Sequence, residues 1–382
     1  MSNKRYGVSY VLVLLSVLAV MTGCSQTLSS TKGPVRIGQA TALTSEYTTV
    51  GQYLLNGAKM AVDEINAAGG IAGRPIELIR EDSANNNSAA VNAITKLIEV
   101  DHVVAILGPD LSTQGFAVAP IINKAKMPFL VEGSNIKLLE NNPWFFRLRP
   151  SDAISAKAAA KFAVLRLKKT KIGITHDTNE YGTGGRDNVT EALKALGAEV
   201  VAVEAYNSND RDLSAQLFNV QKKGAEVIID WGLLSTAPTL ERQKSQLNIK
   251  LPLIGPSAYA MPSNFQLAGD TANGTYVVTD RIPTQVKDPK VVAWCKKYRE
   301  LFNSEPDFHA SADYDGVYLL KAAIEKAGST DSEAIRKALL TIENFEGIST
   351  IFTFKDGNGV HEVVTAQIKN GVPEVLENIK VE

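Results

Sequence analysis

The chain has 382 residues, with 40 lysines and arginines against 41 aspartates and glutamates and a formal charge of −1. This near balance gives no support for a nucleic-acid-binding surface, and two cysteines are too few for a disulfide framework. The length exceeds what one ordinary hydrophobic core needs and predicts two lobes.

The first 34 residues are predicted to be a leader followed by a tether. Lys4 and Arg5 precede an apolar run at 8–21, which is too short for a comfortable membrane span and is typical of a signal peptide over residues 1–23. Met-Thr-Gly-Cys at 21–24 resembles a bacterial lipobox, which implies lipidation of Cys24; the alternative is an ordinary signal with an incidental cysteine. Small polar residues up to 34 then form a flexible tether. Removal of the leader takes away two basic residues, so the processed chain carries a formal charge of −3.

From residue 35 onward, short apolar runs rich in β-branched residues alternate with helical patterns of ten to eighteen residues. Two sets of four strands are expected, at 35–38, 76–80, 103–107 and 129–131, and at 171–175, 200–206, 227–231 and 251–254. This alternation predicts parallel sheets with helices on both faces. The fold class is therefore α/β, with two doubly wound parallel-sheet lobes and a ligand cleft where the carboxyl ends of the strands face each other.

The most informative stretch is 57–82, in which a helical pattern ends at Gly69-Gly70 and a buried strand follows. As a whole string, this stretch resembles the leucine/isoleucine/valine-binding protein family, the extracytoplasmic solute receptors of ABC importers. The resemblance implies a monomer that binds a small solute and delivers it to a permease and an ATPase. It also implies three crossings between the lobes, near 150, 280 and 347. Lobe 1 would then comprise 35–150 plus 281–346, and lobe 2 would comprise 151–280 plus 347–382.

Ligand-binding residues of lobe 1 are expected in two loops after strands. Ser112 or Thr113 could cap a helix with its hydroxyl, while free backbone N–H groups at the helix start suit a carboxylate. Spacing alone favours a purely structural cap, whereas the resemblance implies that Ser112 binds the ligand carboxylate. The next loop, Gly133-Ser134-Asn135, matches the family's loop, where the carbonyl of Gly133 would meet the ligand amino group and Asn135 replaces a threonine.

Lobe 2 contributes three expected ligand contacts. By resemblance, Tyr181 flanks the ligand. Trp231 either stacks on the ligand or fills the core between the lobes. Ser257 stands where amino-acid-binding relatives usually carry the acid that neutralises the ligand ammonium. In lobe 1, Tyr47 could form one wall of the cleft. The polar residues of this loop are equally well explained as those of an ordinary surface loop.

The missing acid at Ser257 leaves the ligand class open, because burying an ammonium without an opposite charge is costly. One alternative is that the alignment of this chain with the family is shifted by a few residues at this position. Another is that the ligand is an organic or aromatic acid, an amide or a polyol without an ammonium. A neighbouring loop could also supply the acid. The candidates are Asp110, Glu132, Asp230 and Asp280, and Glu132 could equally be solvated at the rim. An amino acid of the branched-chain or related class is the preferred ligand.

Two other functional classes are weighed against a transport receptor. Enzyme motifs with metal, nucleophile or phosphate-loop spacing are missing from the sequence, and its four histidines are scattered, so no catalytic residue, metal or cofactor is expected. A ligand sensor would need a separate signalling protein. Cys295 is expected to be a buried structural thiol. The expected location is extracytoplasmic, anchored by lipid to the cell membrane or facing the periplasm in a two-membrane cell.

Overall fold

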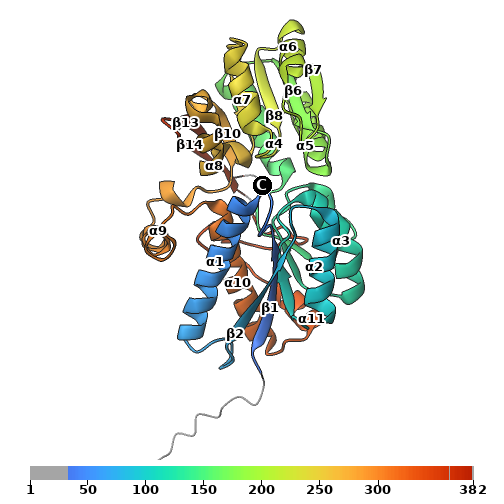
Figure 1. Cartoon of the computed structure of the whole chain (residues 1–382), viewed down its shortest axis with the longest axis vertical. Coiled ribbons are helices and arrows are strands. Elements are labelled where there is room, and N and C mark those ends of the chain that lie inside the picture. Colours follow the sequence, from blue (N-terminus) through green and yellow to red (C-terminus); the bar gives the residue numbers. More distant parts are fainter. Residues whose placement is uncertain (1–32, 361, 381–382) are drawn as a thin grey trace, which may run out of the picture.

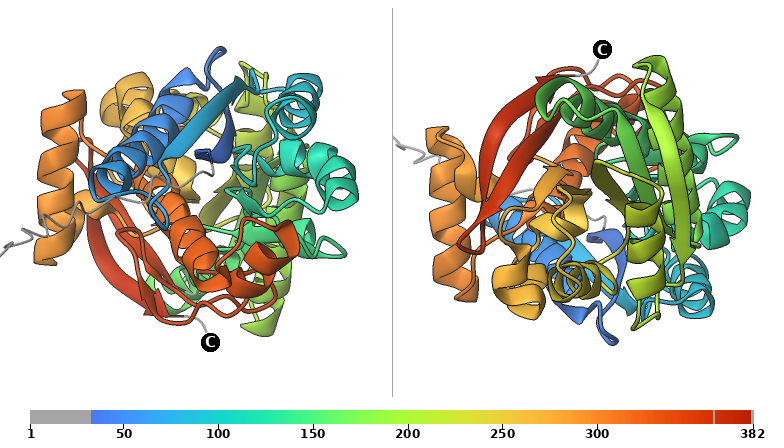
Figure 2. Two further views of the ribbon diagram at one scale, coloured as in Figure 1. Left: turned by 90° about the horizontal axis from the view of Figure 1, so that it is seen from below. Right: turned by 90° about the horizontal axis from the view of Figure 1, so that it is seen from above.

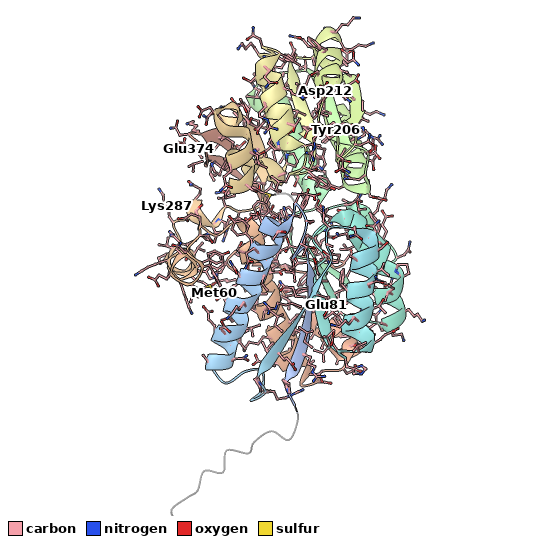
Figure 3. All side chains as sticks on the ribbon, in the orientation of Figure 1. Met60, Glu81, Tyr206, Asp212, Lys287 and Glu374 are labelled. Carbon is pink, nitrogen blue, oxygen red and sulfur yellow. The ribbon has the colours of Figure 1, made fainter. Side chains whose placement is uncertain are left out.

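The computed structural model describes residues 33–360 and 362–380, which form two lobes stacked along the long axis of the molecule (Figure 1). The expected signal peptide, the lipidation at Cys24 and most of the tether lie outside the described residues. Figure 3 marks Met60 and Glu81 in the first lobe and Tyr206 and Asp212 in the second. The expected α/β class with two mainly parallel sheets is confirmed.

The first lobe contains a five-stranded parallel sheet in the order β2-β1-β3-β4-β5. Its strands are β1 (Val35–Thr41), β2 (Ile76–Asp82), β3 (Ala105–Leu107), β4 (Phe129–Val131) and β5 (Phe145–Arg147). Strands β3, β4 and β5 are buried at every position, as expected for strands covered by helices on both faces. The helices of this lobe are α1 (Thr48–Ala67), α2 (Asn87–Glu99), α3 (Ser112–Ala125), α10 (Phe308–Ala327) and α11 (Ser332–Leu339).

The close packing of α1 against α10 explains part of the informative stretch at 57–82. A Cβ on Gly57 would overlap the backbone carbonyl of Ala310, so only glycine permits this approach. Glu64 of α1 accepts hydrogen bonds from the hydroxyls of Tyr314 and Tyr318 on α10, at 2.6 and 2.9 Å. These contacts join helices that are more than 200 residues apart in the sequence. Helix α9 (Pro289–Phe302) stands at the side of the molecule (Figure 2).

The second lobe contains a seven-stranded sheet in the order β14-β13-β10-β9-β8-β6-β7, in which β13 is antiparallel to both of its neighbours. Its strands are β6 (Lys171–Asp177), β7 (Glu199–Tyr206), β8 (Val227–Trp231), β9 (Leu253–Gly255), β10 (Tyr276–Thr279), β13 (Glu362–Lys369) and β14 (Val372–Lys380). Its α-helices are α4 (Asp152–Lys161), α5 (Glu180–Ala195), α6 (Ser214–Lys222), α7 (Ala237–Gln246) and α8 (Pro262–Ala268). The carboxyl ends of its parallel strands face the first lobe (Figure 1).

The chain passes between the lobes three times. The first passage lies between β5 and α4, and the second follows β10. The third was expected near 347, but Phe352, Phe354 and Val360 pack into the core of the first lobe, and β12 (Ile351–Phe352) pairs with β11 (Phe345–Glu346). The passage therefore comes after Val360, just before β13, and the expected boundary at 346/347 is wrong.

Candidate functional site

A cavity lies between the lobes at the carboxyl ends of the parallel strands. Its volume is about 70 Å³. Seven of the nine expected ligand residues line it, namely Tyr47, Ser112, Gly133, Ser134, Tyr181, Trp231 and Ser257. Their contacts with a ligand remain predictions, but loops far apart in the sequence converge here as expected.

The other two expected residues, Thr113 and Asn135, connect the lobes beside the cavity. The Thr113 hydroxyl donates to a carboxylate oxygen of Glu180 at 2.9 Å, and the Asn135 amide donates to the Glu180 carbonyl oxygen at 2.6 Å. Glu180 is the first residue of α5 in the second lobe. Both contacts therefore join the lobes in this closed arrangement.

The start of helix α3 differs in one detail from the expectation. The helix begins at Ser112, its N-cap is Leu111, and neither Ser112 nor Thr113 acts as a side-chain cap. Instead, the Ser112 hydroxyl accepts a hydrogen bond from the backbone N–H of Asn135 at 3.1 Å, which ties the two ligand loops of the first lobe together. The first N–H groups of any helix lack intrahelical acceptors, so this end of the cavity suits an anion.

Arg149 is a cavity residue that sequence reasoning missed. It lies in the first crossing and forms a two-pronged ion pair with Asp280, with Nε and Nη2 at 2.9 and 2.8 Å from the two carboxylate oxygens. Its guanidinium carbon also lies 4.6 Å from the centre of the Phe308 ring. The only signal in the sequence is an arginine next to Pro150, in the segment expected to cross between the lobes.

The ion pair with Arg149 keeps one of the candidate acids, Asp280, ionised. Burial alone would raise the pKa of Asp280, but the charge and hydrogen bonds of Arg149 hold this pKa below its ordinary value. The Ser257 hydroxyl donates to the same carboxylate at 3.1 Å. Asp280 is therefore a carboxylate whose charge is already balanced.

Two other candidate acids accept hydrogen bonds from hydroxyl groups of the chain. Asp230 does not line the cavity; it is completely buried and accepts hydrogen bonds from the hydroxyls of Thr175, Tyr206 and Tyr259 at 2.6 to 2.8 Å. Asp110 does line the cavity, and its carboxylate accepts from the Thr41 hydroxyl at 3.0 Å. Burial raises the pKa of both aspartates to about 6.

Glu132 differs from the other candidates because, within the described residues, no N–H or hydroxyl group donates to either of its oxygens, and its hydrogen-bond partner is another acid, the carboxyl of Asp313. Its side chain is completely buried, so the alternative that it is solvated at the rim is wrong. The nearest cation is Arg149, whose Nε lies 3.7 Å from Oε2. Burial, and then the neighbouring Asp313 carboxyl, raise the pKa of Glu132 well above its ordinary value.

Trp231 and Tyr181 form the aromatic part of the cavity wall. Their ring centres are 6.4 Å apart, and the indole N–H donates to Asp152 at 3.3 Å. A Cβ on Gly185 would overlap the indole, so this glycine leaves the space that the ring occupies. Asp152 was also missed; it starts α4, and burial raises its pKa to about 6.

Part of the cavity lining is apolar. Val50, Leu234, Met261 and Phe308 line it and belong to one buried cluster together with Tyr47. These side chains come from both lobes, so the apolar wall forms only when the lobes are together. The cavity thus combines a charged end with a surface suited to an aliphatic or aromatic side chain.

The sequence pattern of the family described as "Periplasmic binding protein" matches residues 34–372. An amino acid binding protein of Pseudomonas aeruginosa is 28% identical over 325 residues, which are 84% of this chain and 85% of that protein. The branched-chain amino acid transporter substrate binding protein LivJ from Streptococcus pneumoniae, solved with isoleucine, is 26% identical with a TM-score of 0.83, and the match covers 91% of this chain and 99% of that one.

A solute binding protein of an ABC transporter from Rhodopseudomonas palustris, solved with 3,4-dihydroxybenzoic acid, has the same TM-score of 0.83 at 18% identity. The match covers 92% of this chain and 98% of that one, and at this identity the likeness shows the fold alone. Across residues 33–360 and 362–380, no helix is both long and apolar enough to cross a membrane. The chain belongs to the Leu/Ile/Val-binding family of type I periplasmic binding proteins, the extracytoplasmic substrate-binding components of ABC transporters, and is a binding protein rather than an enzyme.

Proposed function

We propose that this chain captures an amino acid of the branched-chain or related class and delivers it to an ABC permease and ATPase. The observation that carries the proposal is the charge of the cavity lining. Its carboxyl groups belong to Asp110, Glu132, Asp152 and Asp280, and Arg149 is the one lysine or arginine among the described lining residues. The ammonium of an amino acid offsets the ligand's own carboxylate, whereas a ligand that brought only a carboxylate would add an uncompensated negative charge to this lining.

Two parts of the cavity lining suit the remaining parts of such a ligand. The start of α3 with Ser112 offers a place for the α-carboxylate. The apolar wall that includes Val50, Leu234 and Met261 offers a place for an aliphatic side chain. The isoleucine bound by the Streptococcus pneumoniae protein supports the same choice of ligand.

The proposed mechanism is hinge closure. The open lobes admit the solute, and Ser112 with the loop at 133–135 binds it first. Tyr181, Trp231 and Ser257 of the second lobe then close over it, and the Thr113 and Asn135 contacts with Glu180 add to the closed form. The closed shape is the form that the permease would recognise.

An acid without an amino group is the second candidate, favoured by the aromatic acid bound to the Rhodopseudomonas palustris protein. A sensor that passes closure to a signalling partner would use the same cavity, and only the identity of the partner would distinguish it. Monomeric state and lipid anchoring at Cys24 are part of the proposal.

A thermal-stability screen tests the choice between these ligands. The chain without residues 1–24 is melted in the presence of amino acids, aromatic acids, short aliphatic acids, amides and polyols. A ligand at a hundred times its dissociation constant stabilises the native state by about 2.7 kcal/mol, which raises the melting midpoint clearly. We expect the midpoint to rise with aliphatic or aromatic amino acids. A rise only with compounds that lack an amino group would overturn the proposal.

A further inference from the structure

Glu132 is a buried acid in the lining of the cavity. It directly follows β4 and precedes Gly133, the residue whose carbonyl is expected to meet the ligand amino group. Its side chain is completely buried, it lines the cavity, and no N–H or hydroxyl group among the described residues donates to either oxygen. Its hydrogen-bond partner is the Asp313 carboxyl, which can donate only while it holds a proton. A buried acceptor without a donor carries a large desolvation penalty, which a donor on the ligand would remove.

We propose that Glu132 is the acceptor for the amino group of the ligand and takes the place of the acid that is absent at Ser257. This inference rests on the proposed function, because it needs a ligand with an amino group. It makes Glu132 the residue that selects amino acids over acids of the same shape.

The other carboxyl groups of the cavity are less suited to this role. Asp280 already has two hydrogen bonds from Arg149 and one from Ser257. Asp110 has the Thr41 hydroxyl. Asp152 accepts from the Trp231 indole and lies in the first turn of α4, where the helix dipole stabilises a negative charge. Among the described residues, the only hydrogen-bond partner of Glu132 is the Asp313 carboxyl, a second acid that can donate to it only while protonated.

The charged groups that face Glu132 come from four segments. They are Asp313 of α10, Asp110 of the loop after β3, Arg149 of the first crossing and Asp280 of the second. One oxygen of Asp313 accepts from the Gln39 amide at 2.5 Å, and the carboxyl also forms a hydrogen bond with Glu132, which requires a proton on one of the two acids. With three acids and one cation nearby, and with Arg149 committed to Asp280, Glu132 and Asp313 hold a proton when the cavity is empty.

When the ligand binds, its ammonium replaces the positive charge of the proton that Glu132 and Asp313 held. The ammonium of the ligand keeps its own protons and donates hydrogen bonds to Glu132. The proton that the two carboxyls held is no longer needed for charge balance and passes to the buffer. Binding of an amino acid near neutral pH is therefore accompanied by net proton release, whereas binding of the corresponding hydroxy acid is not.

The test is isothermal titration with L-leucine, L-isoleucine, L-valine and L-phenylalanine, each paired with the α-hydroxy acid of the same side chain. Titrations in two buffers of different ionisation enthalpy count the protons released. The variants are Glu132→Gln, which keeps the shape of the side chain, and Glu241→Gln as a matched control. Glu241 is a buried glutamate of the second lobe, bonded to Asn264 and Thr275 and outside the cavity.

We expect the unmodified chain to prefer an amino acid over its hydroxy acid and to release protons on binding it. Glu132→Gln should weaken amino-acid binding by about ten- to a hundredfold, the range for a hydrogen bond to a charged group, and should remove both the preference and the proton release. The control should retain all three properties. If Glu132→Gln keeps the affinity and the preference, or if the unmodified chain releases no proton, the role of Glu132 is refuted while amino-acid binding stands. If the unmodified chain binds none of these amino acids, the proposed function fails as well.

Discussion

Arg149 and Asp280 form a two-pronged ion pair that links the first two crossings between the lobes. Arg149 lies between β5 and α4, and Asp280 directly follows β10, yet 131 positions separate them in the chain. Both side chains are largely buried, with 13% and 9% of their surfaces exposed. The pair therefore fixes the two connecting segments beside the cavity and forms part of its charged wall.

Asp280→Asn should be strongly destabilising, because it leaves the Arg149 charge buried without its partner. Loss of one member of a buried pair costs about 3–5 kcal/mol of unfolding free energy. The measurement is chemical denaturation of the ligand-free chain. The control is Glu362→Gln, which removes a looser pair with Arg281 at 3.5 Å and should cost about 1 kcal/mol or less. Equal effects of the two substitutions would show that Asp280 is not needed to balance Arg149.

Gly184→Ala should hinder closure of the lobes without lowering the stability of the ligand-free chain. A Cβ at this position would overlap the Asn135 side-chain amide across the cleft, and separation of the lobes in the proposed open form would remove this overlap. Alanine also favours helix α5 by up to about 1 kcal/mol. We expect an unchanged or higher melting midpoint for the ligand-free chain and weaker ligand binding. Thr190→Ala, on an exposed part of the same helix, should leave binding unchanged. Normal affinity of Gly184→Ala would mean that the lobes do not approach as described.

Ser112→Ala tests the place of the ligand carboxylate. It removes the hydroxyl that accepts from the Asn135 backbone and that would donate to the ligand. Removal of a hydrogen bond to a charged group costs about 1.5–3 kcal/mol, so the dissociation constant should rise by roughly ten- to a hundredfold. Direct titration of the amino acid selected by the thermal screen measures this change. An unaltered affinity would rule out a carboxylate contact at Ser112.

The buried Glu241 should make stability depend on pH. Burial raises its pKa from 4.5 to about 7, so the folded chain binds this proton more tightly than the unfolded chain does. The stabilisation is complete below about pH 4.5 and is lost as the pH rises to about 7. Denaturation curves across this range should therefore show a smaller decline for Glu241→Gln than for the unmodified chain. Parallel declines would mean that Glu241 titrates normally.

Local patterns in the sequence were sufficient to predict most of the fold. The runs at 129–131 and 227–231 match β4 and β8, because strands buried on both faces leave an uninterrupted apolar signal. The third crossing, placed near 347 by family resemblance, comes later in this chain because Phe352 and Phe354 pack into the core of the first lobe.

The site was predictable only where a loop matched a known family pattern. Ser112, Tyr181 and Ser257 were placed at the cavity in this way. Arg149 and Asp152 were not, because each gains its role from a distant partner, Asp280 in one case and Trp231 in the other. A charge beside a crossing has no distinguishing spacing, so only the assembled cavity identifies it.

Titration of the chain with L-leucine and, in parallel, with 3,4-dihydroxybenzoic acid tests the central claim most directly. The proposal predicts saturable binding of one amino acid per chain and no comparable binding of the aromatic acid. Saturable binding of the aromatic acid, with no heat from leucine or any other amino acid, would contradict the claim that this cavity recognises an amino group.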